Sequence, residues 1–300
     1  MKPVIALGLI GLLTLSAPAQ VVQAAPTWGQ DVAIAFGRPG TEIPGGVYRI
    51  GLPRSDLKVT LDGVAIKPAL ALGSWLAFMS HGSNEVMVMG DLVLTDIEVN
   101  PVMAKLVAGG VEITALHNHL LRNTPFTMYM HISGHGDPAK LGKILHDALA
   151  LSGTPLAAPP SAAPAVPETI DLDTAAIDKI MGRTGKVGGG VYAFGIPRAE
   201  APREGGMALP PAMGAAIAIN FQPTGGGKAA ITGDFVLAAS EVNPVLRALR
   251  ENGIEVTALH NHMLNDEPRM FFMHFWANDD AQKLARGLAA ALSHVATAAS

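Results

Sequence analysis

The sequence predicts an α+β protein built from two homologous domains, each a mostly antiparallel sheet covered by two helices. Two observations carry this prediction. One order of expected elements, β-β-β-α-β-β-α, occurs twice in the chain, and strands mixed with helices in this way are typical of a sheet layer packed against a helix layer. A phrase with three histidines also recurs at one constant spacing: His117, His119 and His131 return as His260, His262 and His274.

Each copy is expected to begin with three strands. The first strand follows a pair of glycines and ends in Pro-Arg, the second is short and apolar, and the third opens with Gly-Asp. Alternating and β-branched residues favour strands at these places. The three strands are expected at residues 47–54, 75–79 and 90–94, and again at 191–198, 216–221 and 233–237.

Two helices are expected in each copy. The phrase Glu-Val-Asn-Pro predicts a helix start, with Asn100 or Asn243 as N-cap and the following proline at the first helical position. In the second copy this helix is expected to stop at Gly253, since glycine is common just past a helix end. The histidine-bearing hairpin comes next, and an amphipathic helix closes each copy.

Composition limits the classes of function. A net charge of −4, from 21 basic and 25 acidic residues, argues against a nucleic-acid-binding protein, which needs a clustered basic surface. The absence of cysteine excludes disulfides and thiolate metal sites. Residues 1–25 have the charged start, apolar run and small-residue end of an export signal. We therefore expect a periplasmic or secreted protein with no membrane span after removal of the signal.

The domain boundaries follow from these features. Residues 152–168 are rich in proline and alanine, a composition typical of an extended spacer. The expected organisation is a signal peptide at 1–25, a first domain at 26–151, a linker at 152–168 and a second domain at 169–300.

In each copy two histidines lie two positions apart near the end of an expected strand. Strand alternation places His117 and His119 on the same face, with Cβ atoms roughly 6.5–7 Å apart. If the hairpin turns near Thr124, His131 lies opposite His117, about 5 Å away. The equivalent set in the second copy is His260, His262 and His274. The sequence thus predicts a three-histidine site in each copy.

Three imidazoles with an open fourth position are the ligand set of many catalytic zinc sites. Imidazole also suits copper, so we expect a divalent transition metal, with zinc first and copper as the alternative. Two other interpretations stay open. The histidines could be buried and satisfied by hydrogen bonds, or they could form an acid–base site without a metal.

Four acidic residues are candidates for a catalytic role beside the ion. Asp91 and Asp234 follow a glycine at a strand start, and Glu98 and Glu241 precede the helix. Each could be a fourth ligand, could orient a ring nitrogen, or could act as a general base. The alternatives are a turn residue for each Asp and an acid in the first helical turn for each Glu.

The phrases Gly-Val-Tyr…Pro-Arg, Gly-Asp-x-Val-Leu, Glu-Val-Asn-Pro-Val and Ala-Leu-His-Asn-His…Met-His resemble the LppY/LpqO family. This is a bacterial domain-of-unknown-function family often found as tandem copies, and the resemblance spans nearly the whole chain after the signal. It implies a fold but no activity. The namesakes are lipoproteins, and a chain without cysteine cannot share that anchor. The ending Phe272-Met-His274-Phe-Trp276 resembles the family most closely, so if only one of the two sites works, we expect it to be the one in the second copy.

Together these observations predict an exported metal-binding protein whose partner is a metal ion or a small molecule. The first alternative is a metal-dependent hydrolase that uses an ion-bound water. The second is a non-catalytic envelope binding module in which the histidines are structural. The expected metal ligands are His117, His119, His131, His260, His262 and His274, and the candidate catalytic residues are Asp91, Glu98, Asp234 and Glu241.

Overall fold

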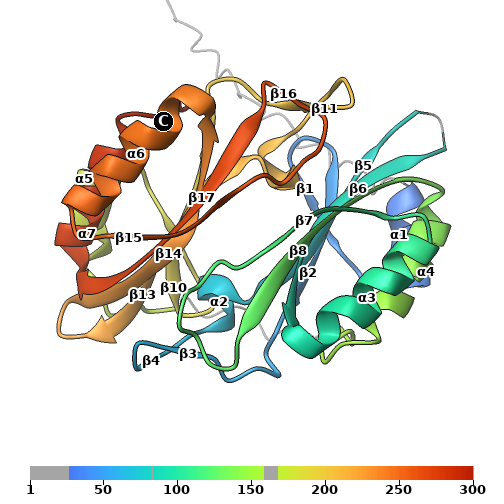
Figure 1. The fold of residues 1–300 in the computed structure, drawn as a ribbon, viewed down its shortest axis with the longest axis horizontal. Coiled ribbons are helices and arrows are strands. Elements are labelled where there is room, and N and C mark those ends of the chain that lie inside the picture. The colour runs from blue at the N-terminus through green and yellow to red at the C-terminus, as the bar shows by residue number, and fades with distance from the viewer. Residues whose placement is uncertain (1–26, 83, 159–167, 300) are drawn as a thin grey trace, which may run out of the picture.

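The computed structural model describes residues 27–82, 84–158 and 168–299. The first copy is a six-stranded antiparallel sheet in the order β1-β2-β5-β6-β8-β7, with its main helices on the outer face (Figure 1). Its elements are α1 (Thr27–Phe36), β1 (Thr41–Ile43), β2 (Val47–Pro53), α2 (Pro68–Ala71), β5 (Gly73–Ser80), β6 (Val86–Thr95), α3 (Asp96–Ala108), β7 (Glu112–His117), β8 (Thr127–Gly136) and α4 (Pro138–Leu149), with a small hairpin of β3 (Thr60–Leu61) and β4 (Val64–Ala65).

The second copy repeats this sheet in the order β9-β10-β13-β14-β17-β15. Its elements are α5 (Thr174–Met181), β9 (Lys186–Gly188), β10 (Val191–Pro197), a 3-10 turn (Pro211–Met213), β13 (Ala216–Gly225), β14 (Lys228–Ala238), α6 (Ala239–Glu251), β15 (Glu255–His260), β17 (Met270–Asp280) and α7 (Ala281–Leu292). The short strands β11 (Arg203–Glu204), β12 (Met207–Ala208) and β16 (Asp266–Glu267) form a separate three-stranded sheet. The α+β class and the two similar domains are therefore confirmed.

Each copy has an unexpected helix before its first strand, and the first copy also contains the short helix α2. Helix α1 packs against α4, and α5 packs against α7. The expected two helices per copy are α3 and α4 or α6 and α7, whereas α1 and α5 precede the first strand. Val32 and Phe36, four residues apart, bury one side of α1, and Ile177 and Met181 do the same in α5. Helices this short show too few turns for their periodicity to be clear in the sequence.

Helices α3 and α6 also start earlier than expected, so Asn100 and Asn243 are not their N-caps. The Thr95 backbone N–H donates to the Glu98 carboxylate at 2.8 Å, which fixes the start of α3 one turn before Pro101. In α6 the Ala238 N–H donates to Glu241 at 2.7 Å in the same way. The prolines lie inside the helices, where each removes one backbone donor.

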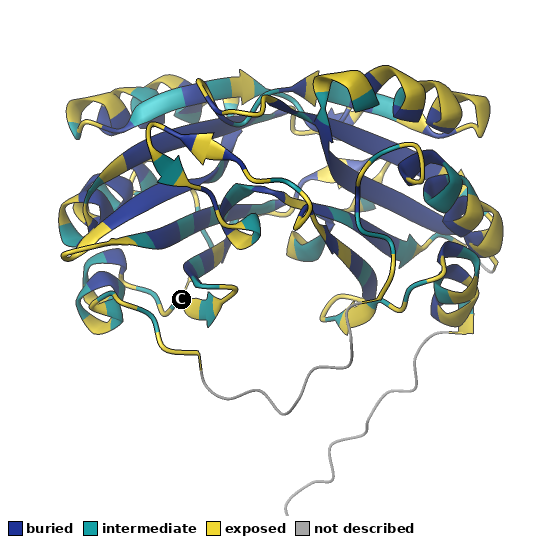
Figure 2. Cartoon of the chain, turned by 90° about the horizontal axis from the view of Figure 1, so that it is seen from below, coloured by how far each residue is buried: buried dark blue, intermediate teal, exposed yellow. Residues whose placement is uncertain are grey.

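The central strands are buried because helices cover one face and the other copy lies over the opposite face. Every residue of β6 except Thr95 is buried, and the outer faces of the helices are exposed (Figure 2). Thus the central strands do not show the polar–apolar alternation of a half-exposed strand. Among the described residues, no helix is long and apolar enough to cross a membrane.

Both histidine hairpins contain a β-bulge and have a register that differs from the expected one. The ladder between β7 and β8 shifts between Ile113 and Ala115, so Ala115 pairs with His131 and His117 pairs with Tyr129. The predicted pairing of His117 with His131 is wrong by two residues, because the hairpin pivots near Asn123 instead of Thr124. The second copy has the same shift, pairing Ala258 with His274 and His260 with Phe272. The extra bulge residue, Thr114 or Thr257, lets the strand bend towards the other copy.

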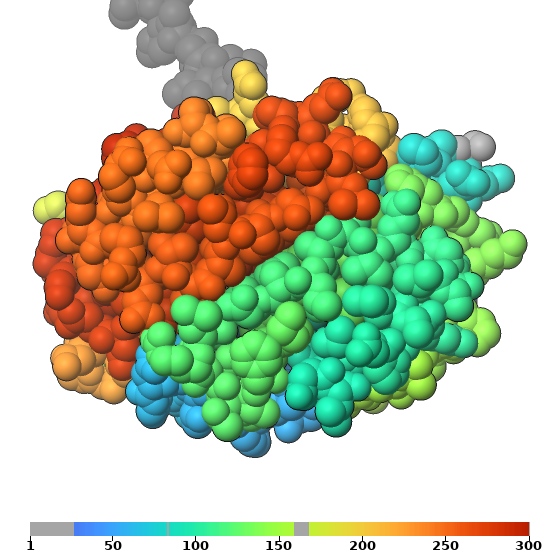
Figure 3. Space-filling model, viewed as in Figure 1, coloured from blue at the N-terminus to red at the C-terminus, as the bar shows by residue number. Residues whose placement is uncertain are grey.

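The two copies meet along a continuous diagonal line, where β7 lies beside β15 (Figure 3). Reciprocal hydrogen bonds join them at the bulges. The Thr114 hydroxyl donates to the His262 carbonyl and the Thr257 hydroxyl donates to the His119 carbonyl, each at 2.6 Å. The Asn118 amide donates to the Thr257 carbonyl, and Asn261 donates to Thr114, each at 3.2 Å. The two His-Asn-His segments are thereby held against each other.

The proline-rich segment is partly attached to the first copy. The Gly153 N–H donates to Glu98 at 2.7 Å, and Arg38 donates to the carbonyls of Pro155 and Ala157. The expected signal peptide and residues 159–167 of the expected linker lie outside the described residues.

Candidate metal centre

All six repeated histidines lie in one cluster between the two copies, which we call the histidine cluster. Each ring stacks on a ring of the other copy. The ring centroids are 3.4 Å apart for His117 and His260, 3.6 Å for His119 and His274, and 3.7 Å for His131 and His262. The structure therefore brings together the residues expected in two separate sites.

Strand geometry positions the rings. His131 and His274 lie on β8 and β17, directly across from Asp91 and Asp234 on β6 and β14. His117 and His260 are the last residues of β7 and β15. His119 and His262 follow in the turns, which the threonine hydroxyls hold through their backbone carbonyls.

Backbone carbonyls define the tautomer of three rings. Nδ1 lies 3.2 Å from the Asn118 carbonyl in His117, 3.1 Å from the Asn261 carbonyl in His260, and 2.7 Å from the Gly233 carbonyl in His274. A carbonyl only accepts, so Nδ1 carries the hydrogen and donates it. Nε2 of these rings then has its lone pair free, which is the usual arrangement of a metal-binding histidine.

The Nε2 atoms of all six histidines are buried and have no hydrogen-bond partner among the described residues. Buried polar atoms are nearly always paired, because an unpaired one costs roughly 1–3 kcal/mol. A bound cation would satisfy several Nε2 atoms at once.

Four sets of ligand atoms lie close enough together to hold an ion. Within each set the atoms are all within 4.8 Å of one another, whereas nitrogen ligands of a tetrahedral zinc at 2.0–2.1 Å are about 3.3 Å apart. A modest contraction would therefore close a set around an ion. The sets are His117/His119/His260/His274, His117/His131/His262, Asp91/His119/His131 and Asp234/His262/His274. Both all-histidine sets combine the two copies.

The two aspartates stand beside the rings without bonding to them. Asp91 lies 3.8 Å from Nε2 of His119 and 3.9 Å from Nε2 of His131. Asp234 lies 3.5 Å from His262 and 3.9 Å from His274. These distances are too long for hydrogen bonds. They leave room for an ion between each carboxylate and its two imidazoles.

Burial determines the protonation of the centre. It lowers the pKa of His117 to about 4 and, together with the neighbouring His117, the pKa of His260 to about 3. The pKa values of the other four rings are also lowered well below the usual value, mainly by burial. The rings are therefore neutral at pH 7, which is the form that binds metals.

The carboxyls shift in the opposite direction. Burial raises the pKa of Asp91 to about 8, although the positive charge of Arg49 opposes this. Burial and the nearby Asp91 raise the pKa of Asp234 well above its usual value. A cation in the centre would favour the ionised form of both.

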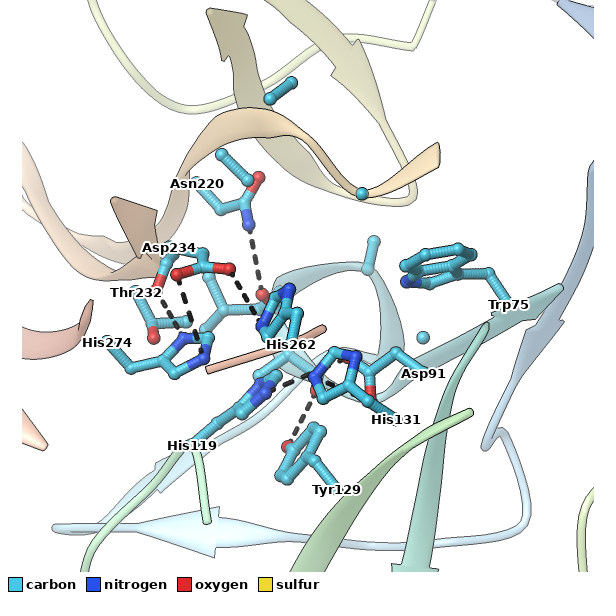
Figure 4. A pocket seen from close by; sticks show the side chains of 18 of the residues that line it. Trp75, Asp91, His119, Tyr129, His131, Asn220, Thr232, Asp234, His262 and His274 are labelled. Atoms are coloured by element: carbon cyan, nitrogen blue, oxygen red, sulfur yellow. Dashed lines mark hydrogen bonds and ion pairs between the residues drawn. The ribbon is translucent and has the colours of Figure 1, made fainter. Parts of the chain in front are cut away.

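A cavity of about 310 Å³ leads to this cluster (Figure 4). Its rim includes the exposed residues Ala69, Gly73 and Pro211. Its floor carries four of the six histidines and both aspartates, and its walls carry Arg49, Trp75, Tyr129, Asn220 and Thr232. The floor residues are Asp91, His119, His131, Asp234, His262 and His274.

A family model matches the chain twice, at residues 30–151 and 175–294, which together make up more than half of it. The chain belongs to the family described as Domain of Unknown Function (DUF1259). The two DUF1259 matches correspond to the two structural copies. A search of curated proteins found no match.

Two solved structures show weak likeness. A trimeric bacterial microcompartment shell protein, PduB, is 12% identical, with a TM-score of 0.20 over 84% of this chain and 88% of that one. EtuB from Clostridium kluyveri is 10% identical, with a TM-score of 0.20 over 85% and 90% of the two chains. Scores this low do not indicate a shared fold.

Glu98 and Glu241 do not reach the histidine cluster in the DUF1259 fold. Glu98 pairs with Arg54 at 2.8 Å and Glu241 pairs with Arg198 at 2.7 Å, each at the start of a helix. Each glutamate also accepts two backbone N–H groups, so its oxygens are already engaged. Each Arg–Glu pair therefore joins the first turn of a helix, α3 or α6, to the end of a strand, β2 or β10. This placement does not support the expected role of the two glutamates beside the ion.

Several residues of the cavity were not predicted. Tyr129 stacks on His119 with ring centroids 3.4 Å apart, as Phe272 does on His262. Arg49 and Trp75 carried no signal because their positions differ between the copies. His81 and His135 have no histidine counterpart in the second copy, yet their rings lie 4.9 Å apart. Neither of these two belongs to a ligand set among the described residues.

Proposed function

We propose that this protein is an exported metal-binding protein whose ion or ions bind in a single centre that both copies build. The observation that supports this most strongly is the set of six buried Nε2 atoms without hydrogen-bond partners among the described residues. Histidines with a purely structural role would donate or accept at both nitrogens. Three of these rings use Nδ1 on a backbone carbonyl and present Nε2 to the centre.

Zinc is the ion we propose first, and copper second. Neutral imidazole binds both, and the two carboxylates add oxygen ligands that also suit zinc. The export part of the proposal rests on residues 1–25, which have the composition of a secretory signal. We place the protein in the periplasm or outside the cell, and the tandem copies in the LppY/LpqO group.

Elemental analysis of untagged protein purified from the periplasm tests the shared centre. Two matched variants remove the same histidines from either copy: His117→Ala/His119→Ala and His260→Ala/His262→Ala. Because each all-histidine set uses both copies, we expect each variant to lose well over half of the bound metal. His294→Ala, which lies outside every ligand set, is the control with unchanged content.

Two results would contradict this proposal. Wild-type metal content in both double variants would remove the histidines from metal binding. A loss of half the metal in each variant would indicate two independent sites, one in each copy.

A second candidate function is metal-dependent hydrolysis with an ion-bound water. The cavity favours it, since a protein that only sequesters an ion needs no space of about 310 Å³ beside the ligands. An ion lowers the pKa of bound water towards ~7, and Asp91 or Asp234 lies close enough to the ligand nitrogens to take its proton. Ester and phosphate hydrolysis by the zinc-loaded protein should fall at least about tenfold in Asp234→Asn, with elemental analysis as the control for metal loss.

A further inference from the structure

The ligands of the centre repeat between the copies, but the walls of the cavity do not. In the first sheet the row through Asp91 and His131 continues to Trp75. The equivalent row through Asp234 and His274 continues to Ala218. One row further along the sheet, the first copy has Arg49, Ala77 and Met89, whereas the second has Ala193, Asn220 and Thr232. One wall is therefore cationic and aromatic, and the other is neutral and polar.

Arg49 is a half-buried cation without a carboxylate partner. Among the described residues it has no carboxylate oxygen within 4.0 Å, and Nη1 donates to the Ala212 carbonyl of the other copy at 2.7 Å. Its guanidinium lies 4.2 Å above the Trp75 ring, which holds the side chain in place. This placement leaves the remaining donors free to bind a planar or tetrahedral oxyanion, for which guanidinium is well suited.

Trp75 supplies a flat apolar surface between Arg49 and the ion ligands. It is half-buried, and its cross-strand neighbour is Asp91. The ring packs so closely on Gly214 of the second copy that a β-carbon there would lie 2.9 Å from it. The wall is therefore fixed by both copies.

We infer that the cavity binds a small oxyanionic molecule, a carboxylate or a phosphate, with its anionic group on Arg49 and its body against Trp75. The inference rests on the proposed function in one respect: the part of the molecule beyond Trp75 would face the bound ion. Asn220 and Thr232, on the opposite wall, offer uncharged polar contacts. The second copy has alanine in place of both Arg49 and Trp75, so the molecule is bound in one orientation.

Calorimetric titration with benzoate and with inorganic phosphate tests the inference, using zinc-loaded and metal-free protein in parallel. We expect Arg49→Gln to weaken binding of the anion at least about tenfold, since hydrogen bonds to a charged group contribute roughly 1.5–3 kcal/mol. The matched control is Ala193→Gln, the equivalent position in the second copy, which should bind as wild type.

The two probes separate the two sources of the oxyanion. A carboxylate with an apolar body should lose affinity in Trp75→Ala as well, whereas phosphate binding should depend mainly on Arg49. Arg49→Lys keeps the charge and should give intermediate affinity, with thermal unfolding as the check that each variant folds.

The inference is overturned if wild type binds neither probe, or if Arg49→Gln binds the probe as tightly as wild type does. Unchanged binding by the zinc-loaded Arg49→Gln variant would show that the anion binds to the ion and not to Arg49. If wild type holds no metal, the proposed function fails, but titration of the metal-free protein still decides whether Arg49 binds an anion.

Discussion

The histidines and the aspartates of the centre have opposite effects on how the stability of the fold depends on pH. The folded protein keeps its six histidines neutral at pH values where the unfolded chain protonates them, near pH 6.5. It also keeps Asp91 protonated up to about pH 8, whereas the unfolded chain releases that proton near pH 4. The histidines therefore destabilise the metal-free fold as the pH falls, and the aspartates destabilise it as the pH rises.

We predict that the metal-free protein is most stable near pH 6.5. From there down to the lowered histidine pKa values, about 4 for His117 and about 3 for His260, the unfolded chain binds more protons and stability falls. The slope is about 1.4 kcal/mol per pH unit for each proton. Above pH 6.5 the loss comes from Asp91 and Asp234. Urea unfolding at a series of pH values measures the profile.

The aspartate part of this profile has its own control. Asp91→Asn combined with Asp234→Asn should abolish the loss of stability above pH 6.5 and steepen the fall between pH 6.5 and about 4, because the aspartates no longer offset the histidines there. A wild-type profile that is flat between pH 6.5 and 8 would contradict the raised carboxyl pKa values.

The paired Arg and Glu residues at the helix starts give a second prediction. Glu241→Ala should cost about 3–5 kcal/mol of unfolding free energy, because it leaves the largely buried Arg198 without its partner. Glu98→Ala should cost less, since Arg54 keeps Asp56 at 2.8 Å. Chemical unfolding measures both changes. Metal content should stay at the wild-type value. A loss of metal in either folded variant would show that these glutamates contribute to metal binding.

At the level of elements, the two bulges determine where the histidine turns meet. We predict that Thr114→Val and Thr257→Val each cost about 1 kcal/mol and weaken zinc binding, because each hydroxyl holds the backbone of a ligand of the other copy. Zinc competition with a chromophoric chelator measures the affinity.

Serine at the same positions retains the hydroxyl and should restore most of the affinity. Wild-type zinc affinity in both valine variants would contradict a role of the two hydroxyl hydrogen bonds in holding the ligands.

Local sequence patterns predicted five of the six strands in each main sheet and the presence of α3 and α6, but not the short edge strands β1 and β9. The Gly-Asp strands and the closing helices carry their signals within about ten residues, at a period that matches their structure. The start of α3 was misplaced because Asn100-Pro101 suggested a cap, while the Thr95–Glu98 hydrogen bond determined it. The bulge at Thr114 has no signature of its own.

Repetition predicted the ligands but not their arrangement. His117 and His260 were expected in different sites, yet their rings stack at 3.4 Å. This contact joins residues far apart in the chain, and it depends on how the two sheets dock. Repetition also gives no signal for Arg49, because its counterpart in the second copy is Ala193.

At the level of the whole molecule, metal and domain docking should be coupled. We predict that cleavage at a protease site inserted between Ala158 and Glu168 leaves the two halves together while zinc is bound. A chelator should then separate them or weaken their association, because any ion that joins the copies is held by ligands from both. Size-exclusion chromatography before and after chelation measures this. Halves that separate with zinc still bound would contradict a shared centre.

The tandem arrangement has a consequence for how this cavity acquired its two unlike sides. Two identical subunits that docked in the same way would have to present the same residues on both walls, because their symmetry copies every substitution. Fusion into one polypeptide removes that obligation. Arginine and tryptophan could then arise on one side and asparagine and threonine on the other, while any change to a ligand histidine in either half would damage the one centre that both halves need.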